Sequence, residues 1–152
     1  MLKEWVDLSP YWNVLEAASE LRDNQKRGFA SSRYWNDKGH FIGLLGEMVY
    51  AIKTGQEINL DLIIYGDGGI DFRDVDVKSS PYWRSPYLLI PVGKPMRVNN
   101  YVLVGIDIPN KRGYIIGWAT KEDILVAERV NFGYGESYRL TSNQLRTGLP
   151  YL

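Results

Sequence analysis

Apolar residues recur at helical spacing near the start of the chain. The first such stretch predicts one helix over residues 10–25, and its apolar positions are Tyr11, Leu15, Ala18 and Leu21. Ser9 directly precedes Pro10, so we expect the helix to begin there, with a serine cap and a proline at the first helical position. The polar and basic residues 24–37 that follow predict a loop.

A second helix is predicted from about residue 39 to residue 54, with Gly55 as its C-terminal cap. Its core-facing positions are Phe41, Leu45, Met48 and Ile52. Gly43 and Gly46 lie inside this helix, where each costs about 1 kcal/mol relative to alanine. We therefore expect another element to pack close to them. Glu47 lies on the same side of the helix as Gly43, away from the apolar stripe.

Runs of β-branched and aromatic residues predict strands in the middle of the chain. These strands span residues 60–65, 70–72, 75–78, 88–92, 101–108 and 114–118. The run 101–108 is almost entirely apolar, so we expect it to be the central strand of a sheet. Thr120, followed by Lys-Glu-Asp, predicts a short helix with an N-cap and an acidic first turn.

The last part of the chain has no clear period. Residues 130–152 predict an irregular tail with a loop at 133–135 and a short helix at 141–146. Taken together, the order of elements predicts one α/β or α+β domain over residues 1–152, with a mixed β-sheet flanked by helices. Its parts are an N-terminal helix and loop (1–38), a core (39–124) and a C-terminal extension (125–152).

Composition narrows the classes of function. The net charge is zero, so any affinity for nucleic acid has to come from a local patch. The absence of cysteine excludes disulfides, thiolate metal sites and cysteine catalysis, and His40 is the single histidine, so a multi-histidine zinc site is excluded. We expect no membrane partner and a cytoplasmic location, or the host cytoplasm for a viral protein, because no signal-peptide-like start or membrane-length apolar run is present.

Candidate chemistry concentrates between residues 66 and 80, where acidic residues and glycines lie between two β-forming runs. With a strand period of two, Asp76 and Lys78 point to one face, and Val75 and Val77 point to the other. The valines are then free to enter a core, whereas the carboxylate and the ammonium need a functional partner or water.

A hairpin would add a second carboxylate to that face. If residues 70–72 and 75–78 pair through a two-residue turn, Asp71 lies directly opposite Asp76, with Cβ atoms about 5 Å apart. Like charges in this arrangement destabilise a hairpin, and a divalent cation between them reverses the sign of the interaction. This register predicts a metal site with a lysine beside it.

The order of these groups resembles the PD-(D/E)XK nuclease superfamily, which includes restriction enzymes, Holliday-junction resolvases and phage nucleases. The resemblance covers roughly residues 39–124 and is carried by Gly46-Glu47, Gly69-Ile70-Asp71, Asp76-Val77-Lys78, the run 101–107 and the run 115–120. Ile70 stands where the proline that names the superfamily would be, and the spacing between Asp71 and Asp76 is short for the family.

The resemblance implies a restriction-endonuclease-like core and a metal-dependent DNA endonuclease, with branched DNA or a junction as a candidate substrate. It implies Mg²⁺ or Mn²⁺ held by Asp71, Asp76 and the Val77 carbonyl, with Glu47 reaching the metal directly or through water. Lys78 would position or activate the attacking water. Hard oxygen ligands suit Mg²⁺, and a lysine can neutralise charge that develops at phosphorus.

Several residues are candidate DNA contacts, each with a structural alternative. They are Ser79, Ser80, Tyr82, Trp83, Arg84, Arg33 and Lys38. The serines cap a turn in the alternative interpretation, and the Tyr82-Trp83-Arg84 loop is an aromatic cluster that closes the core. The basic residues, together with Arg27, Lys94, Arg97, Lys111 and Arg112, are otherwise solvated surface charges.

Other interpretations of the chain remain open. Taken alone, the stretch from Asp71 to Lys78 favours a solvated hairpin with Lys78 as the ion-pair partner of the two aspartates, and it is Glu47 and the strand context that favour the nuclease. Asp67 and Asp74 are interpreted as turn residues and Asp107 as structural. The second functional hypothesis is a non-catalytic nucleic-acid-binding module on the same fold, or an unrelated α/β binding protein. A homodimer is a possible partner state, with Tyr82, Trp83 or Tyr134 as its interface.

Overall fold

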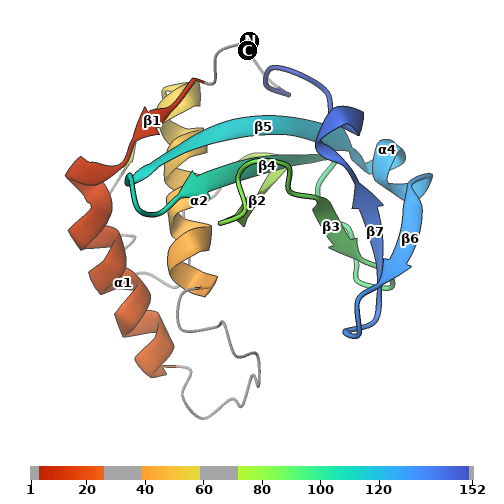
Figure 1. Cartoon of the computed structure of the whole chain (residues 1–152), viewed down its shortest axis with the longest axis horizontal. Coiled ribbons are helices and arrows are strands. Elements are labelled where there is room, and N and C mark those ends of the chain that lie inside the picture. The colour runs from red at the N-terminus through yellow and green to blue at the C-terminus, as the bar shows by residue number, and fades with distance from the viewer. Residues whose placement is uncertain (1–3, 26–38, 59–71, 151–152) are drawn as a thin grey trace.

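Residues 4–25, 39–58 and 72–150 are described by the computed structural model, and they form two β-sheets and a layer of helices (Figure 1). The helices are α1 (Trp12–Gln25), α2 (Gly39–Thr54) and the short α4 (Lys121–Leu125), with 3-10 turns at Ser9–Tyr11 and Ser142–Gln144. Within these residues, no helix is long and apolar enough to cross a membrane.

The larger sheet, sheet A, has four strands in the order β1-β5-β4-β2. Its strands are β1 (Val6–Asp7), β5 (Arg112–Thr120), β4 (Asn100–Asp107) and β2 (Val75–Ser80). Strands β2 and β4 run parallel, whereas β4 pairs with β5 and β5 with β1 in antiparallel fashion. The predicted mixed sheet and the α/β class are therefore confirmed.

The smaller sheet, sheet B, is antiparallel and has the order β3-β7-β6. Its strands are β3 (Leu88–Pro91), β7 (Glu136–Leu140) and β6 (Glu128–Asn131). The irregular tail predicted for residues 130–152 is therefore wrong at the end of β6 and in β7, whereas the predicted loop at 133–135 is confirmed and the helix predicted at 141–146 is a 3-10 turn at Ser142–Gln144. The β6–β7 pair is a hairpin around residues 132–135, and β7 joins it to β3 from the predicted core.

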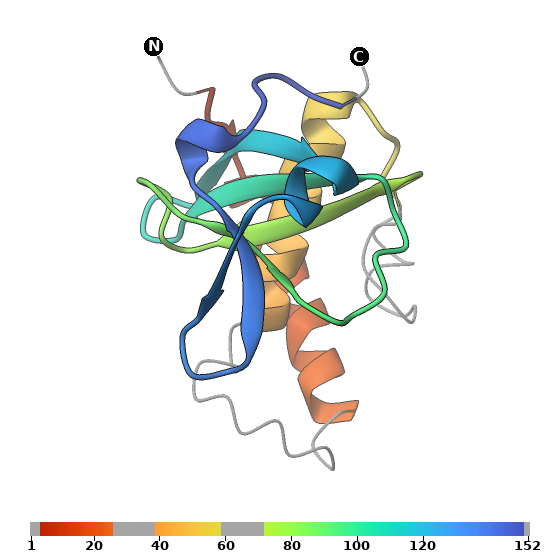
Figure 2. The same cartoon turned by 90° about the vertical axis from the view of Figure 1, so that its right-hand side faces the viewer.

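Sheet A separates two hydrophobic cores. α1 and α2 cover one of its faces, and sheet B covers the other, as the two views in Figures 1 and 2 show. Alternate residues of β4 enter the two cores: Val102 and Val104 pack toward the helices, and Tyr101 and Leu103 pack toward sheet B. All eight residues of β4 are buried, which confirms its predicted central position.

The two predicted long helices are confirmed with small changes. α2 ends at Thr54, and the next residue, Gly55, forms a glycine C-cap with a φ of 72° and a backbone hydrogen bond to the Ile52 carbonyl. The predicted serine cap of the first helix is wrong. The Ser9 amide and hydroxyl both donate to the Asp7 carboxylate, at 3.0 and 2.7 Å, so Asp7 organises the turn that precedes α1.

The strand predicted at residues 60–65, and residues 70 and 71 of the next one, lie outside the described residues. Phe72 is described and is not part of a strand; its ring meets that of Tyr50 of α2 edge to face, with centroids 4.8 Å apart. The predicted strand at residues 75–78 is confirmed and extends to Ser80.

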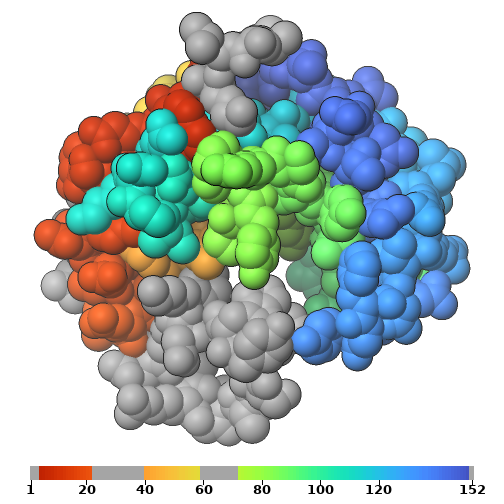
Figure 3. All heavy atoms as spheres, in the orientation of Figure 1, coloured from red at the N-terminus to blue at the C-terminus, as the bar shows by residue number. Residues whose placement is uncertain are grey.

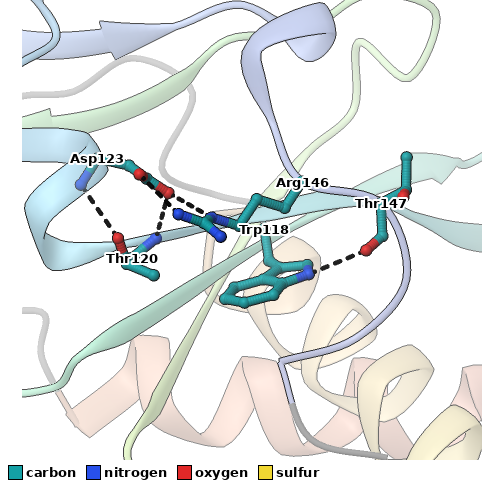
Figure 4. A network of polar contacts seen from close by, with 5 residues as sticks. All are labelled: Trp118, Thr120, Asp123, Arg146 and Thr147. Carbon is teal, nitrogen blue, oxygen red and sulfur yellow. Dashed lines mark hydrogen bonds and ion pairs between the residues drawn. The ribbon is translucent and has the colours of Figure 1, made fainter.

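The predicted helix after Thr120 is confirmed, together with its cap. The Asp123 amide donates to the Thr120 hydroxyl, and the Thr120 amide donates to the Asp123 carboxylate, at 3.1 and 3.0 Å. The Asp123 carboxylate also receives two hydrogen bonds from Arg146, at 2.8 and 3.1 Å (Figure 4). These bonds hold the segment after β7 against α4 and β5.

Candidate active site at the edge of sheet A

The predicted Asp-x-Lys motif lies on β2, the last strand of sheet A in the described part of the chain. The Lys78 ammonium is 3.0 Å from the Asp76 carboxylate, and the two side chains are 42% and 41% exposed. The structure therefore places these side chains on one face of β2, as the strand period predicted. It leaves both accessible to solvent and to a substrate.

This face of β2 is the one that points away from the helices. Val75 and Val77 pack into the core beneath α1 and α2, so Asp76 and Lys78 face the side of sheet A that carries sheet B. Asp76 is paired with Tyr101 of β4 in the parallel register. Burial, together with the negative charge of Asp76, raises the pKa of Tyr101 above its ordinary value, so this phenol remains protonated.

The turn before β2 is fixed by Asp74. Its carboxylate accepts hydrogen bonds from the backbone amide and the side-chain amide of Asn99, at 2.7 and 3.0 Å. Asn100 also donates to the Asp74 carbonyl at 3.3 Å. Because these contacts join the beginnings of β2 and β4, they fix the position of Asp76 along β2 relative to β4. Asp74 is thus a turn residue, as expected.

The backbone at Arg73-Asp74 differs from the type I′ turn that two-residue hairpins favour. A type I′ turn needs positive φ at both central residues. Asp74 has a φ of 55°, and the other non-glycine residue with positive φ in the described part of the chain is Lys111. Arg73-Asp74 is therefore not a type I′ turn. Asp71 itself lies outside the described residues.

α2 approaches β2 most closely at Gly46. A Cβ atom on Gly46 would lie 1.7 Å from the Ser79 hydroxyl oxygen and 2.9 Å from the Ser79 Cβ, so the contact requires glycine. The expectation that an element packs close to the helix glycines is met at Gly46. At Gly43 the corresponding position is open.

The Gly46 contact determines where two predicted site residues lie. The Ser79 hydroxyl is buried without a hydrogen-bond partner among the described atoms, so it would meet a DNA phosphate only if α2 moved away. Glu47 follows Gly46 and is half-buried on the helix-covered side of β2. Asp76 and Lys78 are brought together on the opposite side of the strand.

The donor set for a metal ion is incomplete within the described residues. Asp76 offers a half-exposed carboxylate, which is a hard oxygen ligand of the kind that Mg²⁺ and Mn²⁺ take. No group of three aspartate, glutamate or histidine side chains that could hold a metal forms among residues 4–25, 39–58 and 72–150. Asp76 and the Val77 carbonyl thus fit part of the predicted site, and Asp71 would have to complete it.

The loop after β2 has both anchored and exposed residues. The Tyr82 amide donates to the Ser80 hydroxyl at 3.0 Å, so Ser80 caps the turn, which was the alternative to a phosphate contact. Tyr82 is 80% exposed. The Arg84 guanidinium lies over the Trp83 ring, 5.2 Å from its centroid, and Arg84 is exposed.

Trp83 belongs to an aromatic cluster on sheet A. Its ring meets that of Trp5 edge to face, with centroids 5.2 Å apart, and its carbonyl accepts a hydrogen bond from the Tyr114 hydroxyl at 2.8 Å. Gly105 of β4 lets Trp83 pack against the sheet, because a Cβ atom on residue 105 would lie 2.8 Å from the Trp83 Cβ. The structural interpretation therefore holds for Trp83, while Tyr82 and Arg84 stay exposed beside it.

The predicted basic contacts divide into three groups. Arg27, Arg33 and Lys38 lie outside the described residues. Arg112 is structural, because it donates to Asp107 at 2.9 Å and stacks on Trp5, with 3.8 Å between the guanidinium carbon and the ring centroid. Lys94 and Arg97 are exposed on the segment between β3 and β4.

Two acidic residues away from this edge are held by structural bonds. Asp107 is buried, and hydrogen bonds from Asn110 and Arg112 lower its pKa, which supports the structural role expected for it. Arg146, with the backbone and hydroxyl of Thr120, lowers the pKa of Asp123 to about 2. The sequence analysis did not identify Arg146, because 23 residues separate it from its partner.

Tyr101 is a further neighbour of the site that the sequence analysis did not identify. Its place in the apolar run of β4 predicted only a core residue, and its position beside Asp76 depends on the parallel register of β2 and β4. Figure 3 shows light-green atoms, from the part of the chain that contains β2 and the loop after it, at the surface of this view. The chain matches no protein-family model, no curated protein and no solved structure.

Proposed function

We propose that the chain is a metal-dependent DNA endonuclease whose reaction takes place at the β2 edge of sheet A. The observation that carries this proposal is the pairing of a half-exposed carboxylate, Asp76, with a half-exposed ammonium, Lys78, on an edge strand. Phosphodiester hydrolysis needs a placed nucleophile and positive charge near the phosphoryl oxygens. A carboxylate such as Asp76 can hold a metal-bound nucleophile in place, and an ammonium such as Lys78 can supply the positive charge. Both groups lie at one accessible position.

Each residue has a distinct role in the proposal. Asp76, Asp71 and the Val77 carbonyl would hold Mg²⁺ or Mn²⁺, which when bound supplies Lewis-acid charge and a more acidic water. Glu47 lies on the other side of β2, so it would have to reach this group around the strand and through water. Lys78, 3.0 Å from Asp76, would orient the attacking water and balance negative charge on the phosphoryl group.

The restriction-endonuclease-like core is part of the same proposal. It is supported by the order of a helix bearing Glu47, an edge strand bearing Asp-x-Lys, and a central buried strand in a mixed sheet. The close approach of α2 to β2 at Gly46 also supports it, because that contact keeps the Glu47 turn next to the motif strand. Sheet B is an addition to this core, since it covers the second face of sheet A.

The exposed residues beside the motif suggest how DNA would be held. Tyr82 and Arg84 project from a loop that Trp83 anchors on the sheet, so they would contact a strand whose phosphate lies near Lys78. Tyr82 offers a stacking surface for an unpaired base, and Arg84 offers a phosphate contact. This arrangement favours DNA with accessible or splayed bases, such as a branched substrate.

The test is a cleavage assay on labelled supercoiled plasmid, linear duplex, single-strand, flap and four-way-junction DNA, each with Mg²⁺, Mn²⁺ or EDTA. We expect cleavage that requires the metal and falls by at least about 10²-fold in Lys78→Ala. Circular dichroism would confirm that the variant is folded. Full activity in folded Lys78→Ala, or absence of cleavage on every substrate, would refute the proposal.

The second candidate function is a non-catalytic nucleic-acid-binding module. The observation that favours it is the bond from Lys78 to Asp76, which satisfies both charges without a metal. In that case binding of the same DNA panel would be insensitive to EDTA. Tyr82→Ala would weaken binding, and Asp76→Asn would leave it unchanged.

A further inference from the structure

Sheet B has one face in the core and one face in solvent. Leu88 and Ile90 of β3 point into the core with their partners on β7, and all four side chains are buried. The alternate residue, Leu89, points outward beside Arg139 and is 37% exposed. The outward face is therefore uncovered within the described chain.

Aromatic side chains gather on and beside this outward face. Tyr87 and Phe132 are 44% and 56% exposed. Their ring planes are within 1° of parallel, with centroids 6.5 Å apart. The Arg139 guanidinium lies over Tyr87, 5.0 Å from the ring centroid, and Tyr134 at the tip of the β6–β7 hairpin is 69% exposed. A group of exposed aromatic residues of this kind marks an interaction surface.

The charges around these rings favour a protein partner over nucleic acid. On this outward face Arg139 is ion-paired with Glu128, its cross-strand neighbour on β6. The arginine is thus balanced by a glutamate, so the face offers little net attraction for phosphates. Exposed tyrosine, phenylalanine and arginine with balanced charges are typical of protein interfaces.

The edge of sheet B indicates which protein would bind. β6 is its last strand, and one row of its backbone groups has no strand partner in the described chain (Figure 1). A second copy of the chain can pair with this edge through its own β6. Antiparallel pairing about a two-fold axis then centres on a single residue, because paired side chains must share a face.

The sequence of β6 selects the register of such a pair. Centring on Glu128 or Arg129 would oppose like charges, which destabilises a sheet. Of the two remaining centres, Asn131 gives a polar pair and Val130 an apolar one; centring on Val130 places Arg129 opposite Asn131 of the second copy. If the register continues past the strand ends, Val126 faces Tyr134 of the second copy; these side chains are 86% and 69% exposed.

We propose that the chain forms a two-fold homodimer in which β6 pairs with β6 of a second copy, centred on Val130, to give one continuous six-stranded sheet. The exposed rings of both copies would line one face of this sheet. The proposal is independent of the proposed nuclease activity, because its residues lie on sheet B and its test measures association only.

A single engineered cysteine tests the register directly, because the natural chain has no cysteine. Opposed residues of an antiparallel pair have Cα atoms about 4.5–5.5 Å apart, within the range that a disulfide spans. We expect Val130→Cys to form a covalent dimer under mild oxidation at low protein concentration. Leu21→Cys is the matched control: Leu21 is 43% exposed on α1, on the other side of the molecule (Figure 1).

Sedimentation equilibrium supplies the second measurement. The wild type is expected to be a dimer, Phe132→Asp a folded monomer, and Leu21→Asp a dimer. A wild type that stays monomeric at its highest soluble concentration would overturn the proposal. So would equal cross-linking of Val130→Cys and Leu21→Cys. Binding of a single-stranded oligonucleotide by a monomeric wild type, lost in Phe132→Asp, would instead assign the face to base stacking.

Discussion

Two ion pairs, one on β2 of sheet A and one between α4 and the segment after β7, use the same kinds of charged group for different purposes. At the β2 edge, Lys78 contacts Asp76 through one ion pair between half-exposed side chains. Just after β5, the Asp123 carboxylate receives two hydrogen bonds from Arg146 and one from the Thr120 amide, and the Asp123 amide donates to the Thr120 hydroxyl. Arg146 also lies over the Trp118 ring, 5.4 Å from its centroid, and that indole donates to the Thr147 carbonyl (Figure 4).

The two carboxylates differ in how many hydrogen bonds they already accept. The Asp123 carboxylate accepts three hydrogen bonds, and its bonds to Arg146 and Thr120 lower its pKa to about 2. Its negative charge therefore stabilises the folded structure. Asp76 has lone pairs that still face solvent, and an exposed single ion pair contributes only about 0–1 kcal/mol to stability. A carboxylate with one exposed ion pair is available to a metal ion or a substrate, whereas one that already accepts three hydrogen bonds is much less available.

The largest expected effect comes from removing one charge at each place. Asp76→Asn should lower DNA cleavage by at least about 10²-fold while changing the free energy of unfolding by less than about 1 kcal/mol. Asp123→Asn, the matched control, should keep the cleavage rate and lose stability. Initial cleavage rates and urea unfolding of the same preparations would check both statements. A similar fall in activity in both variants would contradict the distinction.

The next effect concerns the contact that places α2 beside the motif strand. Gly46→Ala should destabilise the protein by about 1–3 kcal/mol, because its methyl group would overlap Ser79. Ser79→Gly removes both overlapping atoms, so the double variant should recover much of that loss. A double-mutant cycle in urea measures the coupling. Gly43→Ala, where the space is open, is the control and should be neutral or stabilising.

A smaller effect is expected from the structural ion pair. Arg146→Ala should lower the free energy of unfolding, because it removes two charge-assisted bonds and a ring contact. Lys78→Ala should cost less than Arg146→Ala in the same urea titration. The reverse order would show that the β2 pair is the structural one.

The smallest expected effect is the pH dependence of the stability that is lost in Arg146→Ala. The pKa of Asp123 is lowered from 3.8 to about 2, so its stabilisation is complete above about pH 4 and is lost as the pH falls through 2. The stability difference between wild type and Arg146→Ala should therefore shrink between pH 4 and pH 2. Urea unfolding at pH 7, 4 and 2.5 would check it. A constant difference across this range would contradict the assigned cause.

Local sequence signals predicted elements whose determinants lie close together in the chain. The glycine cap at Gly55, the capping box at Thr120 and the buried run of β4 each depend on neighbouring residues, and the structure confirms them. The alternation of Asp76 and Lys78 with valines likewise required only the strand period.

Features that depend on distant pairing were not predictable in the same way. Strands β6 and β7 are short, with mostly exposed or half-buried residues, so their sequence indicated an irregular tail. The pairing of β7 with β3, which completes sheet B, joins residues about fifty positions apart. The position of Tyr101 beside Asp76 follows from a parallel register that no local pattern encodes. The same reason explains why the partnership of Asp123 with Arg146 was not foreseen.

The most direct measurement is thermal unfolding of wild type, Asp76→Asn and Asp123→Asn over a titration of Mn²⁺. A metal that binds only the native state raises stability by about 2.7 kcal/mol at a hundred times its Kd. We expect the unfolding temperature of wild type and Asp123→Asn to rise with Mn²⁺, and that of Asp76→Asn to stay constant. Equal shifts in all three proteins, or a shift lost only in Asp123→Asn, would contradict the assignment of the β2 edge as the metal-dependent site.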